Sequence, residues 1–361
     1  MKSFYKIKLL TIIALFIFWV APILVSGQNV VPGKNWVITK TPEKYGFNID
    51  RLKAAEKFAT DNLKTAAVMI IKDGILIHQW GDVAKKYITH STRKSFLSAL
   101  YGKYVESGQI KLDATMAEMG IDDVPPLSDQ EKQATVRDCL KARSGVFHTA
   151  EAENDQMHAQ KPPRNSLKPG SYWIYNNWDF NVLGTIFRKY TGKSVYHALK
   201  DDIADPIQME DYQVADSLES GNERSIHPAY MFQISARDMA RFGLLMLNNG
   251  KWGNKQVISK DWVKESTSYF SDANNYRRDG YGYMWWVAKY HNRYPDFPNV
   301  TVPEGTYSAR GAGGHFMVVI PDYNLVVVHR VDTWQQGNNV TEADFGKLLD
   351  MILKAGTDIK K

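Results

Sequence analysis

Residues 91–97 read Ser-Thr-Arg-Lys-Ser-Phe-Leu, and they open the stretch that decides how this chain folds. The apolar residues of this stretch recur at helical spacing, at Phe96, Leu97, Leu100, Tyr101, Tyr104 and Val105. Because positions three or four residues apart share one face of a helix, we expect a helix that begins at Ser91 and buries that face.

Strand signals lie near both ends of the chain. Four apolar runs form two pairs, Ala66–Ile71 with Ile75–Trp80 and Phe316–Ile320 with Leu325–Val331. Lys72-Asp73-Gly74 joins the first pair and Pro321-Asp322-Tyr323-Asn324 joins the second. Short turns of this composition between apolar runs predict two β-hairpins.

Helix signals surround and separate the hairpins. Besides the helix at Ser91, the capping and stop signals predict helices from Asn48 to about Leu63, from Val182 to Gly192, from Ser235 with Asp238 to Gly250, and from Thr341 with Asp344 to Gly356. We therefore expect one α+β domain over residues 28–361. Its antiparallel sheet is assembled from both chain ends and flanked by the N- and C-terminal helices, and a mainly helical lobe is inserted at about 110–270.

The first 27 residues have the layout of a secretory signal peptide. Three lysines and no acidic residue come first, an apolar run from Leu9 to Val25 follows, and Ser26-Gly27 supplies small residues for cleavage. A retained membrane anchor is the alternative, although Pro22 interrupts the run and a span needs ~20 apolar residues. We expect a periplasmic or secreted protein that is not stably inserted in a membrane after cleavage.

Composition excludes several classes of function. The net charge of the 361-residue chain is +6, and it falls to +3 without the three lysines of the signal segment, which is too mild for a nucleic-acid partner. Cys139 is the single cysteine, so no intramolecular disulfide and no Cys-x-x-Cys zinc site can form. The histidines include no pair at i, i+4. We expect neither a metal nor another cofactor.

Ser91 and Lys94 form the first candidate for chemistry. Residues three apart on a helix are neighbours, so the Lys94 amine can lie beside the Ser91 hydroxyl at the positive end of the helix dipole. A free lysine, with a pKa of about 10.4, is a poor base near neutral pH, and lowering it by ~3 units requires ~4 kcal/mol of burial or nearby positive charge. The alternative is a chance pattern, since Ser3 and Lys6 have the same spacing.

Two further segments carry candidate groups. Tyr175 can exchange a proton with a lysine, and Asn177 can bond that lysine or the substrate; a structural aromatic cluster is the alternative, and Tyr290-His291-Asn292 has the same Tyr-x-Asn form. Residues 310–315, Arg-Gly-Ala-Gly-Gly-His, leave a backbone edge open, and an N–H there can complete an oxyanion hole with the N–H of Ser91. An ordinary glycine turn is the alternative.

Together these motifs resemble the serine β-lactamase and penicillin-binding protein superfamily, and most closely its class C-related hydrolases: esterases, D-amino-acid peptidases and 6-aminohexanoate-dimer-type amide hydrolases. The segments that carry the resemblance are Ser91–Phe96, Leu140–Val146, Tyr175–Gly184, Ser235–Met239 and Gly282–Trp286. It runs from about residue 45 to the C-terminus. It implies Ser91 as acylated nucleophile, Lys94 as its base, Tyr175 as proton shuttle, and the N–H groups of Ser91 and Ala312 as oxyanion hole.

One departure shapes the expected substrate. Where true β-lactamases begin the third motif with the lysine of Lys-Thr-Gly, this chain has Gly311-Ala312-Gly313-Gly314, with Arg310 or His315 as possible replacements. This favours an esterase or amidase acting on a small-molecule ester, amide or peptide, with Asn177, Gly313 and His315 as supporting residues. Trp285 and Trp286 are expected either to line an acyl pocket or to pack in the core. The alternatives are a β-lactamase or D,D-peptidase, or a slowly deacylating penicillin-binding sensor.

Overall fold

The computed structural model describes residues 30–221, 223–289 and 293–357. The predicted signal peptide, residues 1–27, and the second Tyr-x-Asn segment, residues 290–292, lie outside these ranges. Within them, no helix combines the length and the apolar character needed to cross a membrane.

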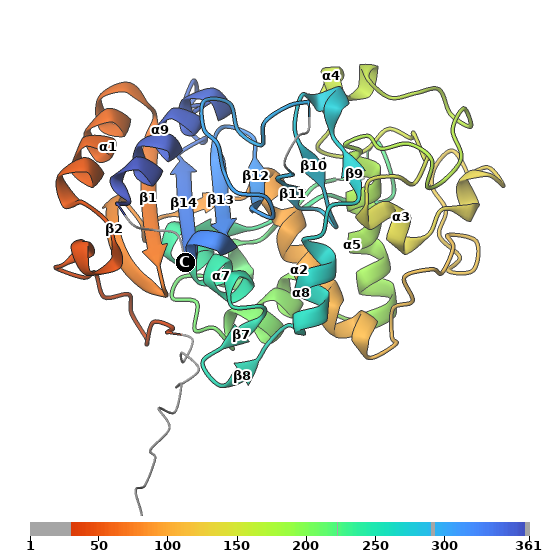
Figure 1. The fold of residues 1–361 in the computed structure, drawn as a ribbon. Coiled ribbons are helices and arrows are strands. Elements are labelled where there is room, and N and C mark those ends of the chain that lie inside the picture. The colour runs from red at the N-terminus through yellow and green to blue at the C-terminus, as the bar shows by residue number, and fades with distance from the viewer. Residues whose placement is uncertain (1–29, 222, 290–292, 358–361) are drawn as a thin grey trace, which may run out of the picture.

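Eight strands of the described chain form one sheet, in the order β2-β1-β14-β13-β12-β11-β10-β9, and the paired neighbours are antiparallel. The bounds are β1 Thr65–Lys72, β2 Ile75–Gly81, β9 Ser271–Asp272, β10 Gly280–Tyr281, β11 Trp286–Val287, β12 Tyr307–Gly311, β13 His315–Ile320 and β14 Leu325–Val331. Both predicted hairpins are confirmed. They meet where β1 pairs with β14, with Met69 opposite Val328, so the sheet does join the two ends of the chain (Figure 1).

The helices are α1 Ile49–Asn62, α2 Arg93–Glu106, α3 Val136–Leu140, α4 Asp155–Ala159, α5 Asn177–Thr191, α6 Val195–Ala198, α7 Ala236–Leu247, α8 Lys260–Ser266 and α9 Glu342–Ala355. Helices α1 and α9 contact each other on one face of the sheet, and α7 contacts β13, β14 and β1 (Figure 1). Alternate side chains of β1 point to opposite faces of the sheet. Val68 and Ile70 pack with α1 and α9, whereas Met69 and Ile71 join the core that contains α7.

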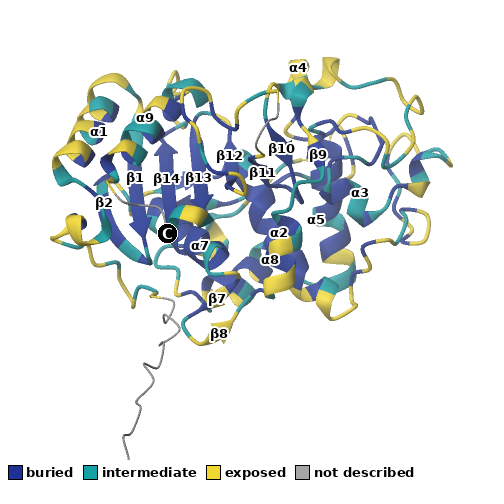
Figure 2. Ribbon diagram, in the orientation of Figure 1, coloured by how far each residue is buried: buried dark blue, intermediate teal, exposed yellow. Residues whose placement is uncertain are grey.

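Helix α2 is more deeply buried than its apolar spacing predicts. Every residue from Arg93 to Gly102 is buried, including the polar ones, so the helix lies inside the core and not only on its surface (Figure 2). Gly102 permits one of the contacts, because a Cβ there would lie 2.5 Å from a ring carbon of Trp262. The predicted apolar face is therefore buried, and the polar residues of the helix are buried with it.

Most predicted caps are confirmed. Asn48 accepts a hydrogen bond from the Arg51 backbone, Gly192 closes α5 in the left-handed conformation, and Thr341 caps α9. The predicted box at Ser235 is only half correct. Ser235 caps α7, but the Asp238 carboxylate accepts from the backbone N–H groups of residues 210–212.

The middle of the chain contains more strand than we expected. Two-residue strands β9–β11 extend the main sheet, and small two-stranded sheets pair β3 Lys86–Ile88 with β6 Gln233–Ser235, β4 Leu218–Glu219 with β5 Tyr230–Met231, and β7 Lys251–Trp252 with β8 Lys255–Gln256. Strands this short show no alternation in sequence, so their pairing is decided by tertiary contacts. Helices α3 to α6 and α8 fall within the residue range predicted for the helical lobe, whereas α7 packs against the sheet.

Candidate active site

Ser91 lies in a tight turn at the start of α2. Residues His90–Thr92 form a 3-10 turn and the α-helix begins at Arg93, two residues after the predicted start. The turn is fixed from both sides. The Thr92 hydroxyl donates to the Thr89 carbonyl at 2.8 Å, and the Thr89 backbone N–H donates to Phe232 O at 2.8 Å. Ser91 is thereby held beside the first turn of a buried helix.

Lys94 occupies the position that its spacing predicts. Its Nζ lies 2.8 Å from Ser91 Oγ and 2.6 Å from the Tyr175 hydroxyl, and the residue is 2% exposed. Burial, and then the positive charge of Arg93, lowers the pKa of Lys94 well below its usual value. The expected direction of the shift is confirmed, and a neutral amine with a lone pair beside a serine hydroxyl can accept that hydroxyl's proton.

Tyr175 is positioned by the residues that follow it. Asn176 caps α5 and donates to Asp179 Oδ1 at 2.7 Å, and Asp179 accepts from the Ser144 hydroxyl at 2.5 Å. The Tyr175 ring stacks on Trp286, with ring centroids 5.6 Å apart and planes inclined by 15°. Burial raises the pKa of Tyr175 above its usual value. The resting hydroxyl is therefore protonated.

Asn177 has a different partner from the one we expected. Its Nδ2 donates to the Ala152 carbonyl at 2.5 Å. Within the described residues no hydrogen bond joins it to Lys94, and its Oδ1 is buried without a partner. As the first residue of α5, its side chain is directed by the helix start, and the Tyr-x-Asn spacing alone does not reveal this direction.

The glycine motif forms the turn between β12 and β13. Gly313 and Gly314 have φ angles of +83° and +102°, which L side chains rarely adopt. Gly311 permits a close approach to the serine turn, because a Cβ there would lie 2.7 Å from Thr89 O. The Ala312 N–H donates to no acceptor within the part of the chain that the structure describes. This edge of β12 is thus brought against the turn that carries Ser91.

His315 does not line the cavity at Ser91. It is fully buried, its ring centroid is 5.3 Å from that of His90, and its Nε2 is 3.4 Å from Thr333 Oγ1. Along a strand successive side chains point to opposite faces, so Phe316, and not His315, faces the cavity. The proposed supporting role of His315 in substrate binding is therefore not supported by its position.

A cavity of about 320 Å³ opens at Ser91 and is lined on one side by Tyr175 and on another by Ala312 and Gly313. Its remaining walls combine aromatic and charged side chains, chiefly Tyr276, Trp286, Phe316, Arg278, Arg310 and Glu342. Trp286 thus has the predicted pocket position, whereas Trp285 is fully buried and stacks on Phe242. Arg278 and Glu342 belong to no motif and were not predicted.

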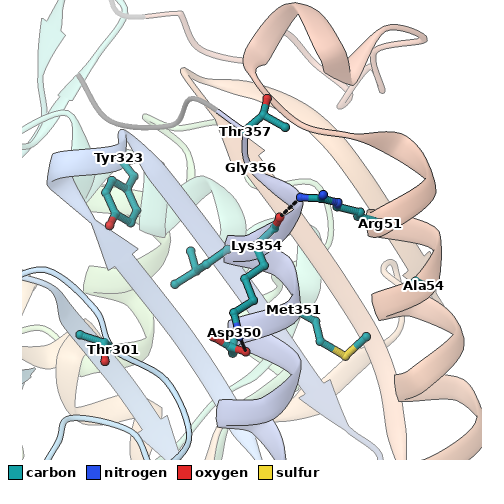
Figure 3. A pocket seen from close by; sticks show the side chains of 10 residues that line it. Arg51, Ala54, Thr301, Tyr323, Asp350, Met351, Lys354, Gly356 and Thr357 are labelled. Carbon is teal, nitrogen blue, oxygen red and sulfur yellow. Dashed lines mark hydrogen bonds and ion pairs between the residues drawn. The ribbon is translucent and has the colours of Figure 1, made fainter.

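A larger hollow of about 820 Å³ lies elsewhere, between α1 and α9 (Figure 3). Three of its charged side chains have partners there, since Arg51 donates to the Lys354 backbone carbonyl at 3.0 Å and the Lys354 amine lies 2.7 Å from Asp350. It is lined by none of the candidate catalytic residues. The smaller cavity is therefore the candidate active site.

Comparisons with known proteins show the family and the fold of this chain. The family model described as beta-lactamase matches residues 53–345. A curated Escherichia coli K12 protein named "Putative D-alanyl-D-alanine carboxypeptidase" is 22% identical, with 85% of this chain and 88% of that protein aligned.

Two solved structures show the same fold at low identity. One is described as "Putative 6-aminohexanoate-dimer hydrolase from Bacillus anthracis", with a TM-score of 0.62, 19% identity, and 91% of this chain and 88% of that chain covered. The other is described as a hydrolase with promiscuous acyltransferase activity. Its TM-score is 0.59 and its identity 14%, and the match covers 89% of this chain and 100% of that chain.

Proposed function

Because this chain belongs to the beta-lactamase family, we propose that it cleaves an ester or amide bond through an acyl-enzyme formed on Ser91. The observation that carries the proposal is the contact of one buried amine with two hydroxyls, since Lys94 Nζ is 2.8 Å from Ser91 Oγ and 2.6 Å from Tyr175 OH. A serine beside a deprotonated amine is an activated nucleophile. The family supports a serine hydrolase in general, and the residues and bond type are our proposal.

Acylation follows from this arrangement. Ser91 Oγ attacks the carbonyl carbon of the substrate while its proton passes to Lys94 Nζ. The oxygen that becomes negative is stabilised by the N–H groups of Ser91 and Ala312. As the tetrahedral intermediate collapses, the proton moves through the Tyr175 hydroxyl to the leaving alcohol or amine. The bond to the leaving group breaks, and the acyl group remains on Ser91.

Deacylation uses the same groups in reverse. A water molecule attacks the acyl carbonyl and gives its proton to the Tyr175–Lys94 pair, which returns a proton to Ser91 Oγ as the acid departs. The aromatic side chains at Tyr276, Trp286 and Phe316 suit an apolar acyl group. This wall, and the absence of the Lys-Thr-Gly lysine, favour an esterase or amidase.

A second candidate function is supported by a curated relative. The Escherichia coli protein is named "Putative D-alanyl-D-alanine carboxypeptidase", so a peptide or β-lactam is a candidate acyl donor for this chain as well. An acyl-enzyme that deacylates slowly would make it a penicillin-binding sensor. All of these alternatives pass through the same acylated Ser91. They differ in the acyl donor, and the sensor differs from the hydrolases in how long the adduct lives.

We also propose that the protein is exported as one domain spanning residues 28–361. The basic start, the apolar run and the small residues before Gln28 support a cleaved signal peptide. Expression of the full chain in a Gram-negative host, followed by mass measurement of the periplasmic product, should show a protein that begins at Gln28. A retained N-terminus in the membrane fraction would indicate the alternative, an N-terminal anchor.

The proposed reaction is tested by intact-protein mass spectrometry. Wild type and Ser91→Ala are each mixed with p-nitrophenyl butyrate or with a penicillin and sampled over time. An adduct on wild type alone identifies Ser91 as the nucleophile. Rapid loss of the adduct with product release indicates a hydrolase, and persistence indicates a sensor. Equal labelling of both proteins would exclude Ser91.

A further inference from the structure

We propose that Glu342 neutralises the arginines of the active-site cavity, so that the enzyme accepts uncharged acyl groups and rejects acyl groups that carry a carboxylate. This inference deepens the proposed function and rests on it. It concerns the charged wall of the cavity at Ser91, formed by Arg278, Arg310 and Glu342. In effect, a carboxylate of the protein occupies the place where a carboxylate of the substrate would otherwise be recognised.

Glu342 binds Arg278 with both of its oxygens. Arg278 Nε donates to Glu342 Oε2 at 2.9 Å, and Arg278 NH2 lies 2.6 Å from Oε1. This two-point geometry is the strongest form of arginine–carboxylate contact. The guanidinium also lies over the Trp286 ring, 4.6 Å from its centroid. Arg278 is thus held over the Trp286 ring, with its charge already paired.

Arg310 is paired behind the same wall. Its Nε donates to Ser308 Oγ at 2.9 Å, its NH1 donates to Asp296 O at 2.8 Å, and its NH2 donates to the Asp296 carboxylate. Glu342 Oε2 lies 3.7 Å from its NH1. The side chain of Arg310 is only 4% exposed, so a ligand could reach it only by displacing these partners.

The charges of this wall therefore balance. Among the described residues that line the cavity, the cations are Arg278 and Arg310, and Glu342 and the adjacent Asp296 compensate them. Burial opposes ionisation of Glu342, but the charges of Arg310 and Arg278 outweigh burial and hold its pKa below the usual range. Glu342 is thus ionised when the enzyme works.

This balance determines which ligand the cavity prefers. A carboxylate that entered it would lose its hydration, would find both guanidinium groups occupied, and would be repelled by Glu342. An uncharged acyl chain meets no such cost and packs against Trp286 and Phe316. Removing the Glu342 charge alone should reverse the preference, because Arg278 then has no anionic partner in the cavity.

The test is a matched pair of ligands measured without turnover. Binding of phenylacetamide and phenylacetate to Ser91→Ala protein is measured by NMR titration at about pH 8, where Asp296, whose pKa burial raises to about 6, is ionised. The same pair is measured with Glu342→Gln added. Glutamine keeps the length of the side chain and an acceptor oxygen for Arg278. Asp344→Asn is the control, because it removes another carboxylate of the first turn of α9, one that bonds Thr341 and Lys347.

We expect the parent protein and the Asp344→Asn control to favour the amide, and Glu342→Gln to shift the acid-to-amide affinity ratio by about tenfold or more toward the acid. The parent binding the acid more tightly would overturn the inference. So would an unchanged ratio in folded Glu342→Gln protein, or no binding of either ligand. In parallel, p-nitrophenyl butyrate and the p-nitrophenyl monoester of succinic acid are assayed with wild type. If the binding preference is present but neither ester is turned over in a Ser91-dependent way, the result counts against the proposed reaction and not against this cavity preference.

Discussion

The amine of Lys94 lies 2.8 Å from the hydroxyl of Ser91, although Lys94 is fully enclosed by the protein. Its neighbours are two hydroxyls and the aromatic rings of Tyr175 and Phe180, whose centroids are 4.4 Å and 4.7 Å from Nζ. An unpaired buried ammonium is costly, so the lysine is held in its neutral form. Burial therefore holds the amine neutral, and the contact with Ser91 directs it at the nucleophile.

Lys94→Met should slow acylation by ~10²- to 10⁴-fold, because the proton acceptor of Ser91 is removed. Methionine fills a similar volume without a buried amine, so the melting temperature should stay equal or rise. Acylation rates come from stopped-flow release of p-nitrophenol, and stability comes from thermal melts. The control is Lys103→Met on the same helix, whose amine is exposed and paired with Asp202. An acylation rate within a few fold of wild type would remove Lys94 as the base.

Tyr175→Phe should cost ~10²-fold or more in rate, and the loss should depend on the leaving group. An alkyl ester or an amide needs a proton as its bond breaks, whereas p-nitrophenolate leaves readily without one. We therefore expect a larger loss for butyl butyrate than for p-nitrophenyl butyrate. Tyr276→Phe is the control, because Tyr276 lines the same cavity. Equal losses for both esters would mean that the hydroxyl does not protonate the leaving group, and unchanged rates would leave Tyr175 as a residue that packs against Trp286.

Arg93→Gln should move the acidic limb of the pH–rate profile to higher pH. After burial, the Arg93 charge is the second cause that lowers the pKa of Lys94. Removing that charge raises the pKa, so a higher pH is needed to obtain the neutral amine. The profile of kcat/KM against pH measures this shift, with Arg51→Gln on the exposed face of α1 as control. An unmoved or downshifted limb would mean that another group titrates there.

The parts of this molecule that follow local rules could be predicted from sequence. The spacing of Ser91 and Lys94 specifies their contact because both belong to one helical turn, and the turn at Asp73 specifies the first hairpin. Arg278 and Glu342 could not be found in this way. They lie 64 residues apart, Arg278 shortly before β10 and Glu342 at the start of α9, and only the tertiary fold brings them together. The positions of Asn177 and His315 were predicted from their motifs, but the direction of each side chain depends on the element that it begins.

The ring of His329 supports the glycine turn in a way that makes the fold sensitive to acid. Its Nδ1 lies 2.6 Å from the Gly314 carbonyl, which can only accept, so Nδ1 carries the proton. In the neutral ring Nε2 then accepts from the Thr65 hydroxyl at 2.9 Å. Burial lowers the pKa of His329 to about 4, against 6.5 for an exposed histidine. The folded state therefore resists a second proton that the unfolded chain accepts.

The sign of the effect follows from this difference. The contribution of neutral His329 to the free energy of unfolding is fully present above about pH 6.5. It is lost as the pH falls toward 4, and the loss for this one group is up to about 3 kcal/mol. His329→Phe should lower the free energy of unfolding near pH 8, because the Gly314 carbonyl loses its donor. Between pH 6.5 and 4.5 it should reduce the slope of the free energy of unfolding against pH by the contribution of about one proton. Urea unfolding at several pH values measures both. Thr65→Val, which removes the other bond of the ring but keeps the imidazole, should retain the wild-type slope. If His329→Phe keeps that slope as well, the acid sensitivity originates elsewhere, and half-buried His90, whose pKa is also lowered to about 4, is the next residue to replace.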